Sequence, residues 1–224
     1  MRVTGIFTQT VCLNFALGQG LYTISEAARL IGEPVQRVRA WLKNYWAEEG
    51  YGKLGDVPTL NFSTLIELKT FVQLRVAGVS ARDIQRARKE LQLIVDDEHP
   101  FANRAVLEGL ATDEKKKVSI RLDENYLSLD GKRQFQLGII EEFMDNLDFG
   151  DNGQARRYTP PKGNGSIVLD PKINFGAPSV AGTRIEASVL HGMRMAGDSV
   201  QLLASLYGLT RKQVEDAINF CMAA

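Results

Sequence analysis

The spacing of apolar side chains over residues 21–93 predicts a series of short helices. Ser25 is a residue type that caps helices, the apolar positions after it fall on one helical face, and Gly32 ends this first helix. Pro34 suits the first turn of a second helix. The buried positions of that helix recur every three or four residues, at Val35, Val38, Leu42 and Trp46. Two short helices joined by a glycine-containing turn predict a helix-turn-helix.

Helix breakers after this unit predict a wing. Residues 47–58 contain three glycines and one proline, a density that stops a helix and suits a short hairpin. A third helix is expected from the capping residue Ser63 to Gly78, and a fourth begins after the capping residue Ser80.

The pattern changes in the middle of the chain. The charged run at residues 96–100 interrupts the helices, and apolar and polar residues alternate from Val118 to Asp123. A second apolar stretch precedes Asp130-Gly131, and alternation around an Asp-Gly pair predicts a β-hairpin. A short amphipathic helix is expected over residues 139–147.

The last third of the chain repeats the helical pattern of the first. A short strand is expected at Ile167–Leu169, followed by a rigid loop and by helices over residues 187–195, 199–207 and 210–218. The turn-forming residues of the loop are Pro178, Gly182, Thr183 and Arg184. They lack the spacing of a phosphate-binding P-loop, so we expect them to shape the chain before the next helix.

Together these patterns predict a mainly α fold with a small β-hairpin region. Its N-terminal part is a winged helix-turn-helix, and its C-terminal part is a small helix-turn-helix-like domain. We expect the boundaries at residues 1–95 for the DNA-binding domain, 96–160 for a hairpin-and-helix linker or interaction region, and 161–224 for the C-terminal helical domain. A length of 224 residues suits one large domain or two small ones.

A formal net charge of zero hides three unequal segments. The 27 basic and 27 acidic residues leave residues 1–90 at +4, residues 91–160 at −5 and residues 161–224 at +1. This balance excludes a protein that coats nucleic acid indiscriminately, which needs a broad positive surface. It permits a DNA-binding segment within residues 1–90. It also permits an acidic middle segment, residues 91–160, on which a basic partner could dock.

The composition excludes several other classes. With 44% hydrophobic and 24% charged residues the chain is an ordinary folded protein. Two distant cysteines and two histidines argue against a disulfide framework, a structural zinc site and an iron–sulfur site, so no metal or cofactor is expected. Residues 3–20 lack the apolar run of a signal peptide or a membrane span, and we expect a cytoplasmic protein with no membrane partner.

The second helix carries the candidate DNA-binding residues. If its apolar positions face the core, the helical period turns Gln36, Arg37, Lys43 and Asn44 outward and places Arg39 at the boundary. Such side chains read base edges or hold phosphates. Thr23 and Ser25 lie at a helix start, which favours phosphate, and Lys53 lies on the presumed wing. The alternative is an exposed polar face on a helical bundle.

Other candidate sites leave more than one interpretation open. Thr210, Arg211, Lys212 and Gln213 begin the last helix and would make either a second DNA contact or a dimer contact. Solvated pairing with nearby carboxylates explains the basic run Arg82, Arg86, Arg88 and Lys89 at least as well as DNA contact does. No catalytic arrangement of side chains is recognisable, so we expect no enzyme.

Two parts of the chain resemble known families. Residues 22–32 and 38–41, followed by 62–79, resemble the winged helix-turn-helix of MerR-like regulators, with Arg39 and Trp41 in the places of the usual Arg-x-aromatic pattern. A small domain long catalogued as of unknown function, associated with VapB-type antitoxins, is similar to a second group of segments. These segments are residues 155–160, 167–171, 175–178, 181–185, 203–210 and 214–218.

The second resemblance implies a DNA-binding antitoxin of a type II toxin-antitoxin system. Such a protein neutralises a toxin, usually a PIN-like ribonuclease, and represses its own operon as a homodimer bound to operator DNA. Two alternatives stay open: a MerR-like transcriptional regulator without a toxin, and a protein–protein interaction module that does not bind DNA.

Overall fold

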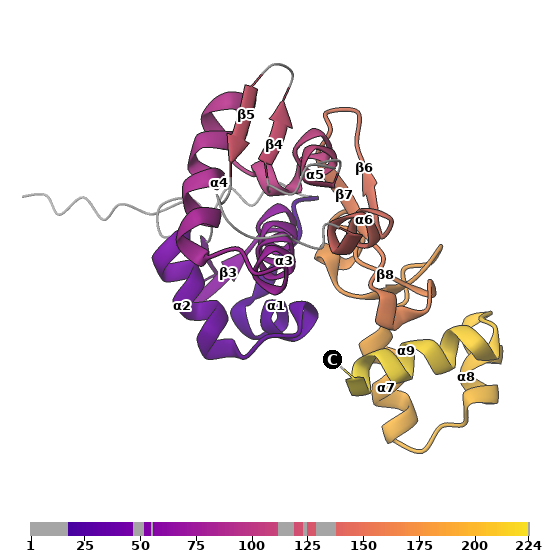
Figure 1. Cartoon of the computed structure of the whole chain (residues 1–224). Helices are drawn as coiled ribbons and strands as arrows, with labels where there is room; N and C mark the ends of the chain where they lie inside the picture. Colours follow the sequence, from indigo (N-terminus) through magenta and orange to yellow (C-terminus); the bar gives the residue numbers. More distant parts are fainter. Residues whose placement is uncertain are drawn as a thin grey trace, which may run out of the picture.

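The computed structural model describes residues 18–46, 52–54, 56–111, 119–122, 125–128 and 138–223. In this part of the chain helices dominate and the strands form small antiparallel sheets, which confirms the predicted mainly α fold (Figure 1). The N-terminal elements are β1 (Tyr22–Thr23), α1 (Ile24–Ile31), α2 (Val35–Tyr45), β2 (Gly52–Leu54), β3 (Val57–Leu60), α3 (Phe62–Val76) and α4 (Ala81–Val95).

The remaining elements divide into a middle group and a C-terminal group. The middle elements are the 3-10 turn η1 (Pro100–Ala102), α5 (Arg104–Ala111), β4 (Ser119–Leu122), β5 (Asn125–Ser128), α6 (Gly138–Met144), β6 (Leu147–Phe149) and β7 (Ala155–Tyr158). The C-terminal elements are η2 (Pro161–Gly163), β8 (Ile167–Val168), η3 (Asn174–Gly176), β9 (Ser179–Val180), α7 (Ala187–Met195), α8 (Val200–Tyr207) and α9 (Arg211–Ala223).

The predicted helix-turn-helix is formed by α1 and α2. Gly32 ends α1 in the left-handed conformation at φ 79°, which a residue without a Cβ adopts at little cost. The cap of α1 is Thr23, so the prediction of Ser25 was wrong: the Thr23 hydroxyl accepts a hydrogen bond from Glu26 N at 3.2 Å. Pro34 is the N-cap of α2.

The wing is a small antiparallel sheet with strand order β1-β3-β2. Tyr22 pairs with Leu60, and Leu54 pairs with Val57 at the end of the hairpin. The next helix, α3, begins at Phe62, and Asn61 is its N-cap. Ser63, the predicted N-cap, lies within the helix. Ser80 caps α4 as predicted, accepting from Asp83 N at 3.1 Å.

The middle elements differ from the sequence expectation in their strand pairing. β4 pairs with β5, with Leu122 opposite Asn125. The hairpin turn predicted at Asp130-Gly131 lies outside the described residues. The helix α6 ends at Met144, short of the expected residue 147, because Leu147 pairs with Tyr158 in a β6–β7 hairpin. The pattern did not predict α5.

Two hydrophobic clusters divide the buried side chains. The larger contains α1 to α4 together with Phe101, Leu107, Ile140 and Phe143 of the middle elements. The smaller is built from β8, β9 and α7 to α9. Figure 1 shows α6 and the β6–β7 hairpin between the N-terminal helices and α7 to α9. The domain boundaries 1–95, 96–160 and 161–224 stay a prediction.

A loop of the C-terminal part is tied directly to the start of the helix-turn-helix. Leu21 N donates to Phe175 O at 2.8 Å, and the Tyr22 hydroxyl donates to Gly176 O at 2.9 Å. Gly176 has φ 88°, and a Cβ there would overlap the Tyr22 hydroxyl. The close approach of β1 and η3 therefore requires glycine at this position.

Candidate nucleic-acid interface

The predicted outward face of α2 is exposed. Gln36, Arg37, Lys43 and Asn44 are solvent-accessible, and so is Arg39, which was expected at the boundary. The apolar positions between them point inward, with Val38 and Leu42 fully buried. Trp41 is half-buried and packs edge-on against Phe71, with ring centroids 5.0 Å apart. Packing of the apolar side thus leaves one polar side of α2 free for a ligand.

The cations on this face are not equivalent. Arg37 Nη1 lies 2.7 Å from Glu33 Oε2, one helical turn away, so its charge is partly compensated. Within the described part of the chain, Arg39 and Lys43 have no carboxylate partner. Arg39 and Lys43 are therefore the α2 cations best placed to meet phosphates or base edges.

The N-terminus of α1 already holds an anion. The Glu26 carboxylate accepts hydrogen bonds from Thr23 N and Thr23 Oγ1, both at 2.8 Å. This carboxylate satisfies the helix start and repels a phosphate there. Ser25 is exposed in the first turn. The geometry thus disfavours Thr23 as a phosphate contact and leaves Ser25 as the accessible hydroxyl.

The wing presents apolar side chains at its end. Leu54 and Val57 are 52% and 49% exposed and face each other across the β2–β3 pair. Lys53 lies on β2 opposite Pro58, but its side chain is outside the described part. The sequence analysis missed Leu54 and Val57, although both flank the glycine-rich turn where a wing end was expected.

The helix α4 meets the C-terminal end of α2. Gln85 Nε2 donates to Asn44 O at 3.4 Å. Arg82, Arg86 and Lys89 are exposed on this helix, and Arg86 pairs with Asp83 at 3.2 Å. The solvated pairing predicted for this basic run therefore holds for Arg86.

Arg88, by contrast, is part of a buried charge network, and its interpretation as a solvated residue was wrong. It is 3% exposed and donates to the fully buried Glu67, with Nη2 2.8 Å from Oε2. Trp46 Nε1 donates to the same carboxylate at 2.9 Å, His99 Nδ1 lies 3.3 Å away, and Phe101 N donates at 3.3 Å. The carboxylate of Glu67 on α3 thus connects the C-terminal end of α2 with α4 and η1.

These contacts outweigh the cost of burial for Glu67. Burial raises the pKa of a carboxyl group, but the hydrogen bond from His99 and the charge and hydrogen bonds of Arg88 lower the pKa of Glu67 below its usual value. The Arg88 guanidinium also lies 5.3 Å from the centre of the Trp46 ring. The network positions α2 against the rest of the winged helix, since Trp46 directly follows that helix.

The second predicted helix-turn-helix uses its polar residues mainly for its own structure. Thr210 and Gln213 form a capping box, in which Gln213 Oε1 accepts from Thr210 N at 2.9 Å and Thr210 Oγ1 accepts from Gln213 N at 3.2 Å. Lys212 Nζ lies 2.7 Å from Asp216 Oδ2. Arg211 is exposed and begins α9. Of the four predicted residues, Arg211 is the one most available to a partner.

Asp216 holds α9 against the turn that precedes β8. It is 6% exposed and accepts from Asn164 Nδ2 at 2.9 Å and from Ser166 Oγ at 2.6 Å. Burial raises the pKa of this carboxyl group, but the hydrogen bonds from Asn164, Lys212 and Ser166 outweigh it and lower the pKa to about 2.

This depressed pKa predicts a loss of stability in acid. Because the ionised form is favoured in the fold, Asp216 stabilises the protein above the unfolded pKa, near 3.8, and this contribution is lost as the pH falls toward 2. The expected loss is about 2 kcal/mol. Chemical unfolding at several pH values, compared between the wild type and Asp216→Asn, measures it. A difference between the two proteins that stays constant from pH 5 to pH 2 would contradict the assignment.

The predicted structural loop has a structural role. Gly182 adopts a φ of 77°. Thr183 Oγ1 donates a hydrogen bond to Val180 O at 2.9 Å and accepts one from Ile185 N at 3.1 Å. Pro178 O accepts from Ala187 N at 2.9 Å, at the first residue of α7. Arg184 is exposed, while its carbonyl accepts from Asn174 Nδ2 at 2.9 Å. These bonds hold together the turn that leads into α7.

The C-terminal helices also expose large apolar side chains. On α8, Leu202 and Leu206 are 52% and 61% exposed and lie one helical turn apart on the same face. On α7, Val189 and Met195 are 43% and 72% exposed. Apolar groups of this size on a surface are typical of protein contacts when they adjoin one another.

The described residues contain neither a metal-ligand cluster nor a membrane-spanning helix. No three His, Cys, Asp or Glu side chains in that part of the chain lie together as metal ligands would. Nor does any helix there have both the length and the apolar character that crossing a bilayer requires.

The chain is similar to known proteins over most of its length. Residues 167–221 match the family model described as "Protein of unknown function (DUF433)". The chain is 25% identical over 227 residues to a Mycobacterium tuberculosis protein named "Putative antitoxin VapB45", covering 89% of this chain and 92% of that protein. It is also 25% identical to "Uncharacterized protein Rv2308" of the same organism, covering 91% of each. The crystal structure of Rv2018 from M. tuberculosis matches with a TM-score of 0.67 and 22% identity, over 88% of this chain and 96% of that chain, and therefore has the same fold.

Proposed function

We propose that the protein is an antitoxin that binds operator DNA through α2 and neutralises a toxin protein. The exposed polar face of α2 supports the DNA-binding half, because Arg39 and Lys43 project from a helix-turn-helix whose residues Val38 and Leu42 are packed in the core. This face is the observation that carries the proposal. The wing end at Leu54 and Val57 would lie along the DNA beside α2.

The toxin half of the proposal is supported by the likeness to the relative named as an antitoxin. That alignment spans 89% of this chain and 92% of the relative, so the likeness is not confined to the segment that matches the DUF433 model. The toxin that we propose is a PIN-like ribonuclease, as the resemblance implies. Such an antitoxin would repress its own operon and would not act as an enzyme.

We assign the toxin contact to the exposed face of α8. Leu202 and Leu206 offer adjacent apolar side chains in the segment that matches the DUF433 model. A protein that covers them removes apolar surface from water, which favours association by about 25 cal/mol per Å² before the costs of binding. The acidic middle of the chain, where Glu141 is exposed on α6, is the alternative docking site.

Operator binding as a homodimer completes the proposal. Two helix-turn-helix units related by two-fold symmetry contact half-sites about one DNA turn apart, on the order of 34 Å. An operator with inverted repeats at this spacing in the promoter of the gene is therefore expected. Light scattering of the free protein and of the protein–operator complex measures the number of copies.

Co-expression with the toxin encoded beside this gene tests the antitoxin half. The wild-type protein should restore growth, and Leu202→Asp/Leu206→Asp should not, because two buried charges would oppose the contact. The same variant should bind operator DNA as the wild type does, which shows that it is folded. Glu141→Lys serves as the matched control on α6. Rescue by the leucine variant together with failure of Glu141→Lys would move the toxin contact to the acidic middle, and growth arrest with the wild type would refute neutralisation.

An interaction module without DNA binding is the second candidate, favoured by the exposed apolar residues of α7 and α8. The two functions differ in one observation. Under the second, immobilised promoter DNA fails to retain the wild-type protein, whereas the toxin still co-purifies with it.

A further inference from the structure

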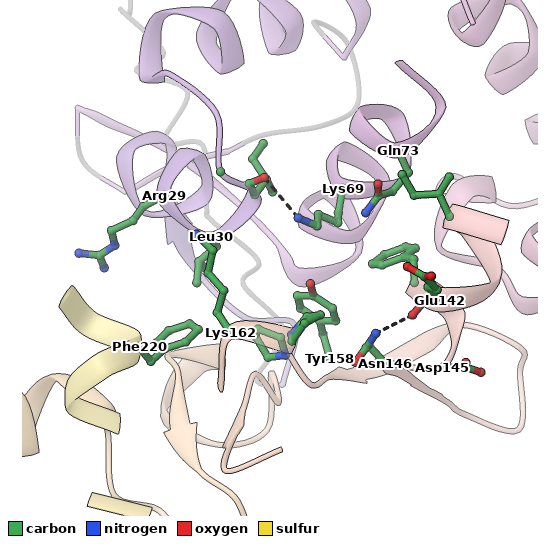
Figure 2. Close-up of a pocket in the computed structure, with 16 residues that line it drawn as sticks. Arg29, Leu30, Lys69, Gln73, Glu142, Asp145, Asn146, Tyr158, Lys162 and Phe220 are labelled. Atoms are coloured by element: carbon green, nitrogen blue, oxygen red, sulfur yellow. Dashed lines mark hydrogen bonds between the residues drawn. The ribbon is translucent and has the colours of Figure 1, made fainter. Parts of the chain in front are cut away.

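A cavity of about 540 Å³ lies where the winged helix meets the C-terminal elements (Figure 2). Its walls come from α1, α3, α6, the end of β7 with η2, and α9. The side chain of Leu30 in this wall packs against both hydrophobic clusters. The volume falls in the range of about 300–1,000 Å³ that is typical of small-molecule sites.

One wall of the cavity is apolar and aromatic. Phe143 and Tyr158 pack edge to face with ring centroids 5.8 Å apart, and both are buried, as are Pro160 and Phe220. Burial raises the pKa of Tyr158 to about 12, so this side chain is a neutral phenol at physiological pH. Figure 2 shows the Tyr158 hydroxyl pointing into the cavity on the side of Lys69.

The opposite wall holds Lys69, an incompletely satisfied cation. Its Nζ donates to Ile31 O at 3.3 Å, and among the described residues no carboxylate pairs with it. An ammonium group has three donors, so two stay available for a ligand. Burial lowers the pKa of Lys69, the charge of Lys162 lowers it further, and Glu33 partly opposes this. A bound anion would offset both the burial of the Lys69 ammonium group and its repulsion by Lys162.

The rim of the cavity carries charges of both signs. Arg29 and Lys162 are exposed on the side of α1 and η2, and Lys162 Nζ donates to Ala223 O at 3.2 Å. Glu142 and Asp145 are exposed on the side of α6. Because these rim groups are hydrated and Lys69 is half-buried, Lys69 offers the stronger electrostatic anchor.

We propose that this cavity binds a small anion with an aromatic or apolar body. The carboxylate or phosphate of the ligand accepts hydrogen bonds from Lys69 Nζ and the Tyr158 hydroxyl, and its body packs against Phe143, Pro160 and Phe220. Since α1 and α9 both line the cavity, the ligand bridges the helix-turn-helix and the C-terminal helices. Its binding free energy therefore adds to the stability of that arrangement.

Calorimetric titration with phenyl phosphate, benzoate, inorganic phosphate and phenol tests this site on the full chain. Phenyl phosphate and benzoate should bind saturably at one site per chain. Inorganic phosphate lacks the apolar body and phenol lacks the charge, so each should bind at least tenfold more weakly. Binding of both aromatic anions with only the affinity of inorganic phosphate would show charge attraction alone and would overturn the proposal.

Substitutions at Lys69 locate the binding. Lys69→Met should weaken phenyl phosphate binding at least tenfold, Lys69→Arg should retain binding within a few-fold, and Tyr158→Phe should cost an intermediate factor. Lys172→Met removes an exposed lysine elsewhere and is the matched control. If Lys69→Met does not fold, the affinities of Lys69→Arg and Tyr158→Phe for phenyl phosphate still test the site. Unchanged affinity in Lys69→Met and Tyr158→Phe, or no saturable binding of either aromatic anion to the wild type, refutes the site.

Discussion

Replacing Arg88 by methionine should lower the free energy of unfolding by about 3–5 kcal/mol, the usual cost of breaking a buried ion pair. The substitution leaves Glu67 fully buried without its guanidinium partner, and the neutral donors Trp46 Nε1 and Phe101 N cannot neutralise a carboxylate as a cation does. Urea unfolding followed by circular dichroism measures the loss. Methionine keeps most of the side-chain length, so packing changes little.

Two further variants separate the charge effect from general destabilisation. Arg86→Met removes an arginine whose side chain is 59% exposed from the same helix, and its ion pair with Asp83 should contribute at most about 1 kcal/mol. The double variant Glu67→Met/Arg88→Met removes both buried charges and should be more stable than Arg88→Met alone. A loss below about 1 kcal/mol for Arg88→Met, or a double variant less stable than the single one, would contradict the network.

Replacing Arg39 and Lys43 together by alanine should weaken operator binding by a factor of about 10 to 1,000. A bidentate base contact contributes about 1–3 kcal/mol, and a phosphate contact adds an electrostatic part that depends on salt. The slope of the logarithm of the association constant for DNA against the logarithm of the salt concentration should become shallower by about 0.9 for each phosphate that the variant no longer neutralises. Fluorescence anisotropy with labelled promoter DNA at several salt concentrations measures both quantities.

The matched control removes two exposed cations outside the winged helix, as in Lys172→Ala/Arg194→Ala. Its net charge change is the same, so it should leave both the affinity and the salt slope close to wild type. Arg37→Ala should have a smaller effect than Arg39→Ala, because Arg37 is already paired with Glu33. Equal losses of affinity in the control and in the α2 variant would remove α2 from the DNA-binding role.

Much of the local structure follows from neighbouring residues. The helices α1 to α4, the stop at Gly32, the Ser80 cap and the bounds of α7 were predictable, since apolar periodicity and caps act over a few positions. The outward face of α2 followed from the same periodicity. Even local signals failed where they competed: Ser25 and Ser63 are good capping residues, but Thr23 and Asn61 precede them and cap the helices.

The tertiary structure decided the roles of the charged residues. By sequence Arg88 belongs to an exposed basic run, but it is buried because Glu67, 21 positions earlier, lies under α4. Lys69 and Tyr158 resemble ordinary helix and strand residues until the tertiary structure brings both to the wall of one cavity. The sequence by itself determined most of the helices and several of their ends, because helix and turn propensities are local. Only the tertiary structure decided which charges are buried, paired or free, because desolvation and Coulomb energies depend on distances between residues that are remote along the chain.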